Sequence, residues 1–217
     1  MQADRKEILR YLGYGKSEAD ERIKGLIEEC IQEVERCASP KVVTKVVPVG
    51  LVSQEDKEWI DFGWFHTQSR NLTTNLKDCE QVIFFAATLG VGIDQLIKKY
   101  SKFEMSRVVV IQAVATALLE EYCDEQCRKL SKEWEEKGFY IRPRFSPGYG
   151  DFSLECQKSL LSALEADKRI GVYLTDSLLM TPSKSVSAVI GLSRKPHRCE
   201  IKGCEACGKA DCVYRRN

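Results

Sequence analysis

The chain has 217 residues, enough for one sizeable domain with its own core and too few for two large domains. Its 33 lysines and arginines against 32 aspartates and glutamates give a formal net charge of +1, so no strong field attracts nucleic acid or an anionic membrane surface. No apolar run reaches the roughly 18 to 20 residues that a membrane-spanning helix needs, and residues 1–6 open on a polar helix, not on a signal peptide. We therefore expect a cytoplasmic protein whose partners are small molecules or proteins, with no nucleic acid and no membrane among them.

The first 40 residues form the N-terminal helical segment of the predicted organisation. Apolar residues at three- and four-residue spacings predict two helices within residues 4–37, broken at residues 13–15. The adjacent run 13–17 has some features of a phosphate loop, but Arg10 stands where the first glycine should be and no strand precedes it. We therefore reject nucleotide binding here.

Strand and helix patterns then follow in order through the middle of the chain. Residues 42–52 are rich in β-branched side chains and predict a strand that is interrupted or ended at Pro48. Residues 69–77 are typical of a short helix, residues 82–88 of a buried strand, and residues 93–100 of an amphipathic helix.

The longest predicted helix covers residues 106–137, because Ser106 can cap it, Gly138 can end it and nothing between them breaks it. One face of this helix carries small side chains followed by two carboxylates: Val109, Ala113, Ala117, Glu120 and Asp124. Small residues allow another element to approach closely, so the carboxylates beyond them can face a cleft.

A loop rich in glycine and proline, residues 144–151, leads into the last third of the domain. Glycine lets a backbone approach a ligand, and Arg144 can clamp a carboxylate with two hydrogen bonds, although an ordinary surface connection is the commoner role for such a loop. Downstream we predict a helix over residues 153–168 and strands over residues 170–175 and 184–193.

The loop also carries a recognisable motif. The run Arg144-Phe145-Ser146-Pro147-Gly148-Tyr149 resembles the Arg-x-x-x-Gly-Tyr signature of the activation domain of cobalamin-dependent methionine synthase. The resemblance continues at matching separations through residues 164–168, Gly171, residues 174–177, Met180, Pro182 and residues 185–187. With a weaker upstream part it covers roughly residues 80–193.

This resemblance implies a fold and a function. The fold is α/β (α+β), a twisted and mainly antiparallel sheet packed with helices, which we assign to residues 41–193. The domains of that family bind S-adenosylmethionine and support reductive methylation of cobalamin that has become inactive. The implied activity is therefore of the methyltransferase type, a methionine synthase reactivation component.

The resemblance also implies roles for individual residues. The S-adenosylmethionine contacts carried over are Glu120, Arg144, Ser146, Pro147, Gly148 and Tyr149. Tyr149 is also the residue expected to act in methyl transfer, and it faces the corrinoid together with Met180, Pro182 and Ser185. The alignment along the long helix is ambiguous by one residue, so Glu121 is an alternative to Glu120.

The cobalamin itself must be held elsewhere. The cobalamin-ligating motif Asp-x-His-x-x-Gly is absent, since the only histidines in the 217 residues are His66 and His197. The expected partners are a corrinoid-carrying protein, such as a methionine synthase lacking its own activation domain, and a flavodoxin or ferredoxin-like electron donor. The alternative is a non-catalytic accessory protein that senses S-adenosylmethionine or delivers electrons.

The tail over residues 194–217 carries a second signal. Cys199, Cys204, Cys207 and Cys212 have the spacing Cys-x4-Cys-x2-Cys-x4-Cys, compact enough for four thiolates to meet at one metal. Four thiolates suit zinc or an iron-sulfur cluster, and a reaction that consumes an electron favours the cluster. Cys123 and Cys127, one turn apart on the long helix, are more typical of core residues than of metal ligands.

Overall fold

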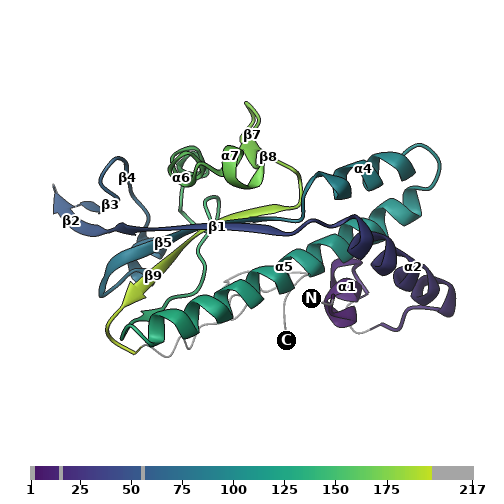
Figure 1. The fold of residues 1–217 in the computed structure, drawn as a ribbon, viewed down its shortest axis with the longest axis horizontal. Coiled ribbons are helices and arrows are strands. Elements are labelled where there is room, and N and C mark those ends of the chain that lie inside the picture. The colour runs from purple at the N-terminus through teal and green to yellow at the C-terminus, as the bar shows by residue number, and fades with distance from the viewer. Residues whose placement is uncertain (1–2, 15–16, 55–56, 197–217) are drawn as a thin grey trace.

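The computed structural model of the chain describes residues 3–14, 17–54 and 57–196, with the backbone alone for residues 53–54 and 57–58. Figure 1 shows an elongated molecule in which a twisted sheet separates two groups of helices. The tail cysteines lie outside the described residues.

The central sheet has the strand order β1-β5-β9-β6 and is antiparallel throughout. Its strands are β1 (Lys41–Pro48), β5 (Cys79–Thr88), β6 (Tyr140–Ile141) and β9 (Ser185–Ser193). The middle strand β5 is almost wholly buried, and its side chains alternate between two cores. Ile83 and Phe85 belong to one core and Val82 and Phe84 to the other, as the two-residue period of a strand requires.

Four helices share the first core. They are α1 (Arg5–Tyr11), α2 (Glu21–Cys37), α4 (Val91–Tyr100) and the long α5 (Met105–Glu135). Figure 1 shows α5 running diagonally beneath the sheet, with α1 and α2 packed on its N-terminal half. The helical segment predicted for residues 1–40 therefore buries its apolar side chains in the core that α5 shares with the sheet.

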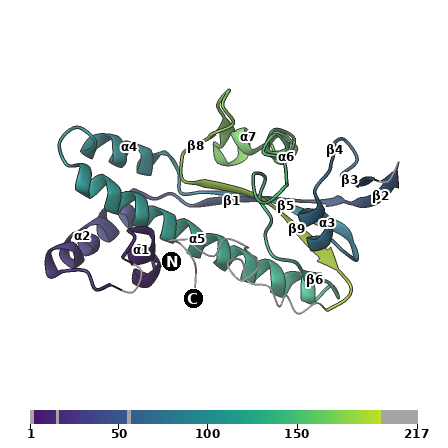
Figure 2. The ribbon, with the colours of Figure 1, turned by 180° about the vertical axis from the view of Figure 1, so that it is seen from behind.

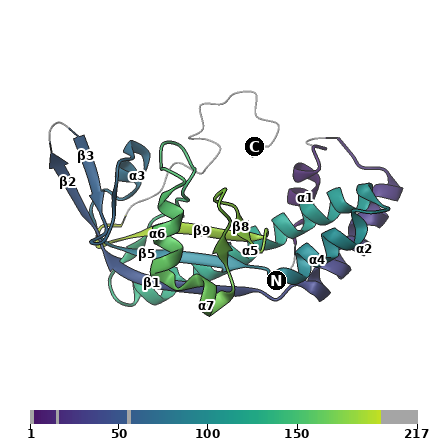
Figure 3. The same cartoon turned by 90° about the horizontal axis from the view of Figure 1, so that it is seen from above.

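The second core lies on the opposite face of the sheet. Figure 3, which looks onto this face, shows α6 (Cys156–Leu164) in front of the strands with α7 (Ala166–Ile170) after it, and both helices contact β1 and β5. The short hairpin of β7 (Tyr173–Leu174) and β8 (Met180–Thr181) extends beyond them, and Figure 2 shows β8 beside the start of α4.

A smaller three-stranded sheet, with the order β2-β3-β4, extends from one end of the molecule. It consists of β2 (Gly50–Gln54), β3 (Lys57–Asp61) and β4 (His66–Thr67), next to α3 (Arg70–Asn75). The sequence predicted no strand in residues 57–67. None of the helices that the structure describes combines the length and the apolar surface needed to span a membrane.

Several predicted boundaries were wrong. The predicted helix over residues 153–168 divides at Glu165, whose φ of 49° is left-handed, into α6 and α7. Ile170 is the last residue of α7, and Gly171, with φ 72°, is the C-cap of this helix. The strand expected over residues 170–175 is therefore only the two-residue strand β7. The long helix starts at Met105 after the N-cap Glu104, which leaves Ser106 inside the first turn.

Candidate functional site

The side chain of Arg144 lies against α5 and contacts both carboxylates of the predicted stripe. Its Nη2 atom is 3.0 Å from Oε2 of Glu120 and 2.9 Å from Oδ1 of Asp124. The guanidinium side chain is only 18% exposed, while the two carboxylate side chains are 35% and 49% exposed. A largely buried cation therefore meets two acids that solvent still reaches.

The helical period of α5 explains this arrangement. Glu120, Cys123, Asp124 and Cys127 occupy positions i, i+3, i+4 and i+7, so all four share one face of the helix. Nη1 of Arg144 donates to Sγ of Cys127 at 3.8 Å, a long contact with a weak acceptor. Ala113 and Ala117 of the same stripe are buried, as expected where another element packs closely.

The two candidate glutamates differ in their contacts. Oε1 of Glu121 accepts a hydrogen bond from Nη2 of the exposed Arg128 at 2.7 Å, whereas Glu120 contacts Arg144. The structure thus places Glu120, and not Glu121, beside the arginine of the motif.

The two cysteines near Arg144 are neutral thiols. Burial raises the pKa of Cys123 to about 12 and also raises the pKa of Cys127. Protonated buried thiols are poor nucleophiles and poor metal ligands. Among the described residues, no three histidine, cysteine or acidic side chains are placed to hold a metal ion.

The loop that carries Arg144 is bound to the edge of the sheet. Phe145 and Val189 form an isolated antiparallel bridge, with N–H to O distances of 2.9 Å in both directions. The bridge attaches the loop backbone to β9 at Phe145, the residue that follows Arg144. The direction of the Arg144 side chain is therefore set by the sheet.

Beyond the bridge the loop makes a compact turn. The amide of Gly148 donates to the carbonyl of Phe152 at 2.8 Å, and the amide of Tyr149 donates to the carbonyl of Ser146 at 3.1 Å. Gly148 has φ 89°, a left-handed conformation in which glycine is favoured. Pro147 is buried, and the Tyr149 side chain projects outward, 69% exposed.

Asp151 ties the end of this turn to α3. Its carboxylate accepts hydrogen bonds from Ser69 Oγ at 2.5 Å and from the backbone amides of Arg70 and Asn71 at 2.8 and 3.2 Å. These contacts hold the pKa of Asp151 below its ordinary value, chiefly through the Ser69 hydroxyl. No local pattern in the sequence marks Asp151 as functional, since its partner Ser69 is 82 residues away.

The segment predicted to face the corrinoid is more buried than the Arg144 loop. Pro182 and Ser185 are buried, and Ser185 Oγ lies 2.7 Å from the carbonyl oxygen of Pro182 and 2.9 Å from Thr88 Oγ1, with one proton to give to either. Met180 is half-buried against the second core. No hydrogen bond or ion pair within the described ranges joins this segment to Arg144.

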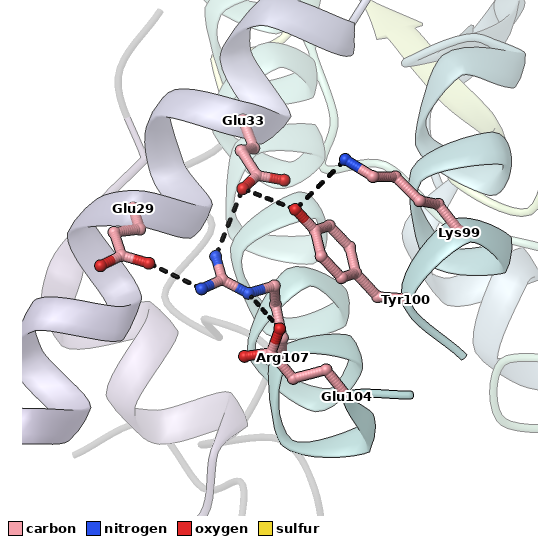
Figure 4. A network of polar contacts seen from close by, with 6 residues as sticks. All are labelled: Glu29, Glu33, Lys99, Tyr100, Glu104 and Arg107. Atoms are coloured by element: carbon pink, nitrogen blue, oxygen red, sulfur yellow. Dashed lines mark hydrogen bonds and ion pairs between the residues drawn. The ribbon is translucent and has the colours of Figure 1, made fainter. Parts of the chain in front are cut away.

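A second charged cluster, shown in Figure 4, lies where α2, α4 and α5 meet. Arg107 contacts Glu29, Glu33 and Glu104 at 2.7, 3.3 and 3.0 Å, and Tyr100 donates its hydroxyl to Glu33. These groups line a cavity of about 310 Å³. Because most of their charges are already paired across helices, we interpret the cluster as structural.

Comparison with known proteins places the chain in a family. Its sequence matches the family described as the activation domain of vitamin B12 dependent methionine synthase over residues 71–211, from α3 into the cysteine tail. Among solved structures, the fold is similar to that of the MetH reactivation domain in its crystal structure with AdoHcy, with a TM-score of 0.62 and 15% sequence identity. That likeness covers 91% of this chain and 79% of the other. No curated protein matches the sequence.

The predicted fold, a mainly antiparallel sheet packed with helices, is thus confirmed. The matched region includes α5, the loop of residues 144–151 and the strand that holds it, so it contains every element of the candidate site. On a match that covers more than half of its length, the chain belongs to the family of vitamin B12 dependent methionine synthase activation domains.

Proposed function

We propose that this chain binds S-adenosylmethionine and presents its methyl group to a corrinoid carried by a partner. The observation that supports the proposal is the contact of Arg144 with Glu120 and Asp124, on the loop that bears the family signature. The similar MetH reactivation domain was crystallised with AdoHcy, which is the demethylated product of the ligand proposed here.

The charges of this cluster suit the ligand. One guanidinium and two carboxylates sum to a charge of −1, whereas S-adenosylmethionine carries a carboxylate, an ammonium and a sulfonium, which sum to +1. The guanidinium has five N–H donors in a fork that matches a carboxylate, and one of its nitrogens, Nη2, makes both contacts with the two acids. The partly exposed oxygens of Glu120 and Asp124 can accept the ammonium and face the sulfonium.

The chain contributes mainly positioning to the transfer. A reduced corrinoid on the partner would supply the nucleophile that takes the methyl group from the sulfonium and leaves AdoHcy, so this chain needs no side-chain base. Tyr149 projects from a rigid turn beside Arg144, so its ring can meet a flat corrinoid face. A partner of flavodoxin or ferredoxin type supplies the electron.

The tail cysteines belong to the same proposal. We infer that Cys199, Cys204, Cys207 and Cys212 bind an iron-sulfur cluster or zinc, on the strength of their spacing alone. Thiolate ligation would also order the segment, because the free energy of binding the metal becomes free energy of folding.

Two measurements on the purified protein test the function. Calorimetry with S-adenosylmethionine is expected to show binding at one site, and a reduced corrinoid protein is expected to become methylated when both are present. Binding without methyl transfer would favour the accessory role, and absence of binding would contradict both the proposed function and the role of an S-adenosylmethionine sensor.

A further inference from the structure

The ammonium group of Lys184 is half-buried and lies close to α5. Nζ of Lys184 donates to Oγ1 of Thr116 at 2.9 Å, across 68 residues of sequence. No carboxylate among the described residues lies within ion-pair distance of this ammonium, and Thr116 is its sole hydrogen-bond partner there. Two of its three N–H donors therefore have no acceptor in the part of the chain that the structure describes.

The backbone of Lys184 is held firmly. Its carbonyl accepts from the amide of Leu89 at 2.9 Å and from Thr88 Oγ1 at 3.3 Å. The preceding Ser183 donates its amide to Asp94 of α4 at 3.0 Å, and its hydroxyl bonds the same carboxylate. Asp94 is thus occupied by Ser183, and Lys184 is aimed at α5 from a rigid connection.

Thr116 links this lysine to the Arg144 cluster. It lies one helical turn before Glu120 on α5, and side chains four residues apart on a helix have Cβ atoms about 5–6 Å apart. The Thr116 hydroxyl gives its proton to the carbonyl of Gln112 at 2.8 Å, so it can only accept from Lys184. The side chains of Lys184 and Arg144 consequently contact neighbouring turns of α5, at Thr116 and at Glu120.

We propose that Lys184 is a second anchor for the ligand, donating hydrogen bonds to the ribose and adenine acceptors at the adenosine end of S-adenosylmethionine. This inference rests on the proposed function, because it takes the ligand carboxylate to be bound by Arg144. A chain of carbons and the sulfonium separates that carboxylate from the ribose, which allows the ligand to extend from one turn of α5 to the next.

The energetic cost of burying the Lys184 ammonium favours a ligand-binding role for this residue over a structural one. An ammonium that is partly withdrawn from water and has no described carboxylate within ion-pair distance destabilises the folded chain. Burial lowers the pKa of Lys184, while the nearby Asp94 opposes that change. A half-buried ammonium beside the proposed ligand site, with N–H groups that have no acceptor among the described residues, is the arrangement expected of a binding residue.

The test uses the full chain and three titrants: S-adenosylhomocysteine, methylthioadenosine for the adenosine end, and methionine for the amino-acid end. Lys184→Met removes the ammonium and keeps an apolar stem, and Lys195→Met, at an exposed lysine paired with Asp78, is the matched control. We expect Lys184→Met to weaken the affinity for S-adenosylhomocysteine and for methylthioadenosine about tenfold or more, because a hydrogen bond from a charged donor is lost. The affinity for methionine should change less than about twofold. Lys195→Met should leave the affinities for all three titrants unchanged.

The melting temperature, measured by thermal unfolding, tests the role of Lys184 without any ligand. If Lys184 serves binding, its replacement by methionine should leave the melting temperature unchanged or raise it. A marked fall would show that the lysine stabilises the fold and would overturn the proposal. Unchanged affinity for S-adenosylhomocysteine in Lys184→Met, or an equal loss for methionine, would also overturn it. Wild-type protein that binds none of the three titrants would instead overturn the proposed function.

Discussion

At the scale of single residues, the candidate site depends on one guanidinium, which contacts two carboxylates from a neighbouring element. Glu120 and Asp124 neutralise Arg144 in the absence of ligand, so the arginine can remain largely buried without an uncompensated charge. The same acids are partly exposed and remain available to a cationic ligand. Arg144 is thus held in place before binding, which reduces the entropy that the ligand must overcome.

The substitution Arg144→Ala should weaken S-adenosylmethionine binding by about 2 to 5 kcal/mol, because the ligand carboxylate loses its bidentate donor. Calorimetry would measure the change. Arg128→Ala is the matched control, since Arg128 lies on the exposed side of α5 and pairs with Glu121. Equal affinity in the Arg144 variant would remove this residue from the site.

Tyr149 should act at a later step than Arg144. Its side chain is exposed and makes an edge contact with Phe145 at 6.3 Å between ring centroids, so it can be truncated without opening the core. We expect Tyr149→Ala to slow methylation of a reduced corrinoid protein by about tenfold or more while S-adenosylmethionine affinity changes little. Calorimetry and a methylation assay on the same preparation would separate the two effects, and a loss of ligand binding as large as that in Arg144→Ala would contradict the assignment.

The four tail cysteines should bind metal in stoichiometric amount. We expect anaerobic preparations to contain iron and inorganic sulfide, because four thiolates within a short segment suit a cluster and the proposed reaction requires an electron. Replacing Cys204 and Cys207 with serine should remove the metal, whereas serine at Cys156, a free thiol of α6, should not. Zinc without iron would contradict the redox role, and four alkylatable thiols with no metal would contradict metal binding altogether.

At the scale of elements, the motif loop is held at both ends by contacts with distant segments. Phe145 bridges to β9, and Asp151 accepts from Ser69 and the first amides of α3. Gly150 has φ 55° and lies so close to Asn71 that a Cβ there would clash with that side chain. The loop and α3 are therefore fitted to each other, and this fit determines how Tyr149 projects.

Asp151→Ala should lower the free energy of unfolding by about 1 kcal/mol, the usual effect of losing a cap at a helix N-terminus, and should speed hydrogen exchange of the Arg70 and Asn71 amides. The folded pKa of Asp151 is depressed, so its contribution is present above the ordinary value of 3.8 and is lost as the pH falls through the lower folded pKa. Asp167→Ala, in the first turn of the exposed face of α7, is the control. Unchanged exchange at Arg70 and Asn71 would show that Asp151 does not hold α3.

At the scale of the whole molecule, two cores on opposite faces of one sheet join elements that are far apart in the sequence. The first core brings α1 and α2 against α5, and the Arg107 cluster strengthens this contact at its rim. Hydrogen bonding to Glu29 raises the pKa of Arg107 above its ordinary range. The N-terminal helices are thus attached to the helix that carries Glu120.

Arg107→Met should destabilise the chain by about 1 to 3 kcal/mol, because it leaves Glu33, one of whose oxygens has no described partner, without its cation. Denaturant unfolding would measure the loss. Arg5→Met is the matched control, since the Arg5–Glu28 pair also joins two helices but is exposed, and such pairs contribute less than about 1 kcal/mol. Equal effects from the two substitutions would contradict a special role for the cluster.

The sequence by itself determined those features that depend on near neighbours. The helical period placed Ala113, Ala117, Glu120 and Asp124 on one face, the alternation of Val186, Ala188, Ile190 and Leu192 predicted a strand, and the motif at residues 144–149 indicated the family. Each of these signals is contained within a few turns or one strand. They require no knowledge of what packs against them.

Only the tertiary structure decided which distant groups meet. The contact of Arg144 with Glu120 spans 24 residues, that of Lys184 with Thr116 spans 68, and that of Ser69 with Asp151 spans 82. No local period relates such positions, because they are brought together by the pairing of β9 with β5 and β6 and by the packing of α5 beneath the sheet. The break at Glu165 was missed because no glycine or proline marks it in the sequence, although its left-handed φ of 49° separates α6 from α7 and both helices bury apolar side chains in the second core.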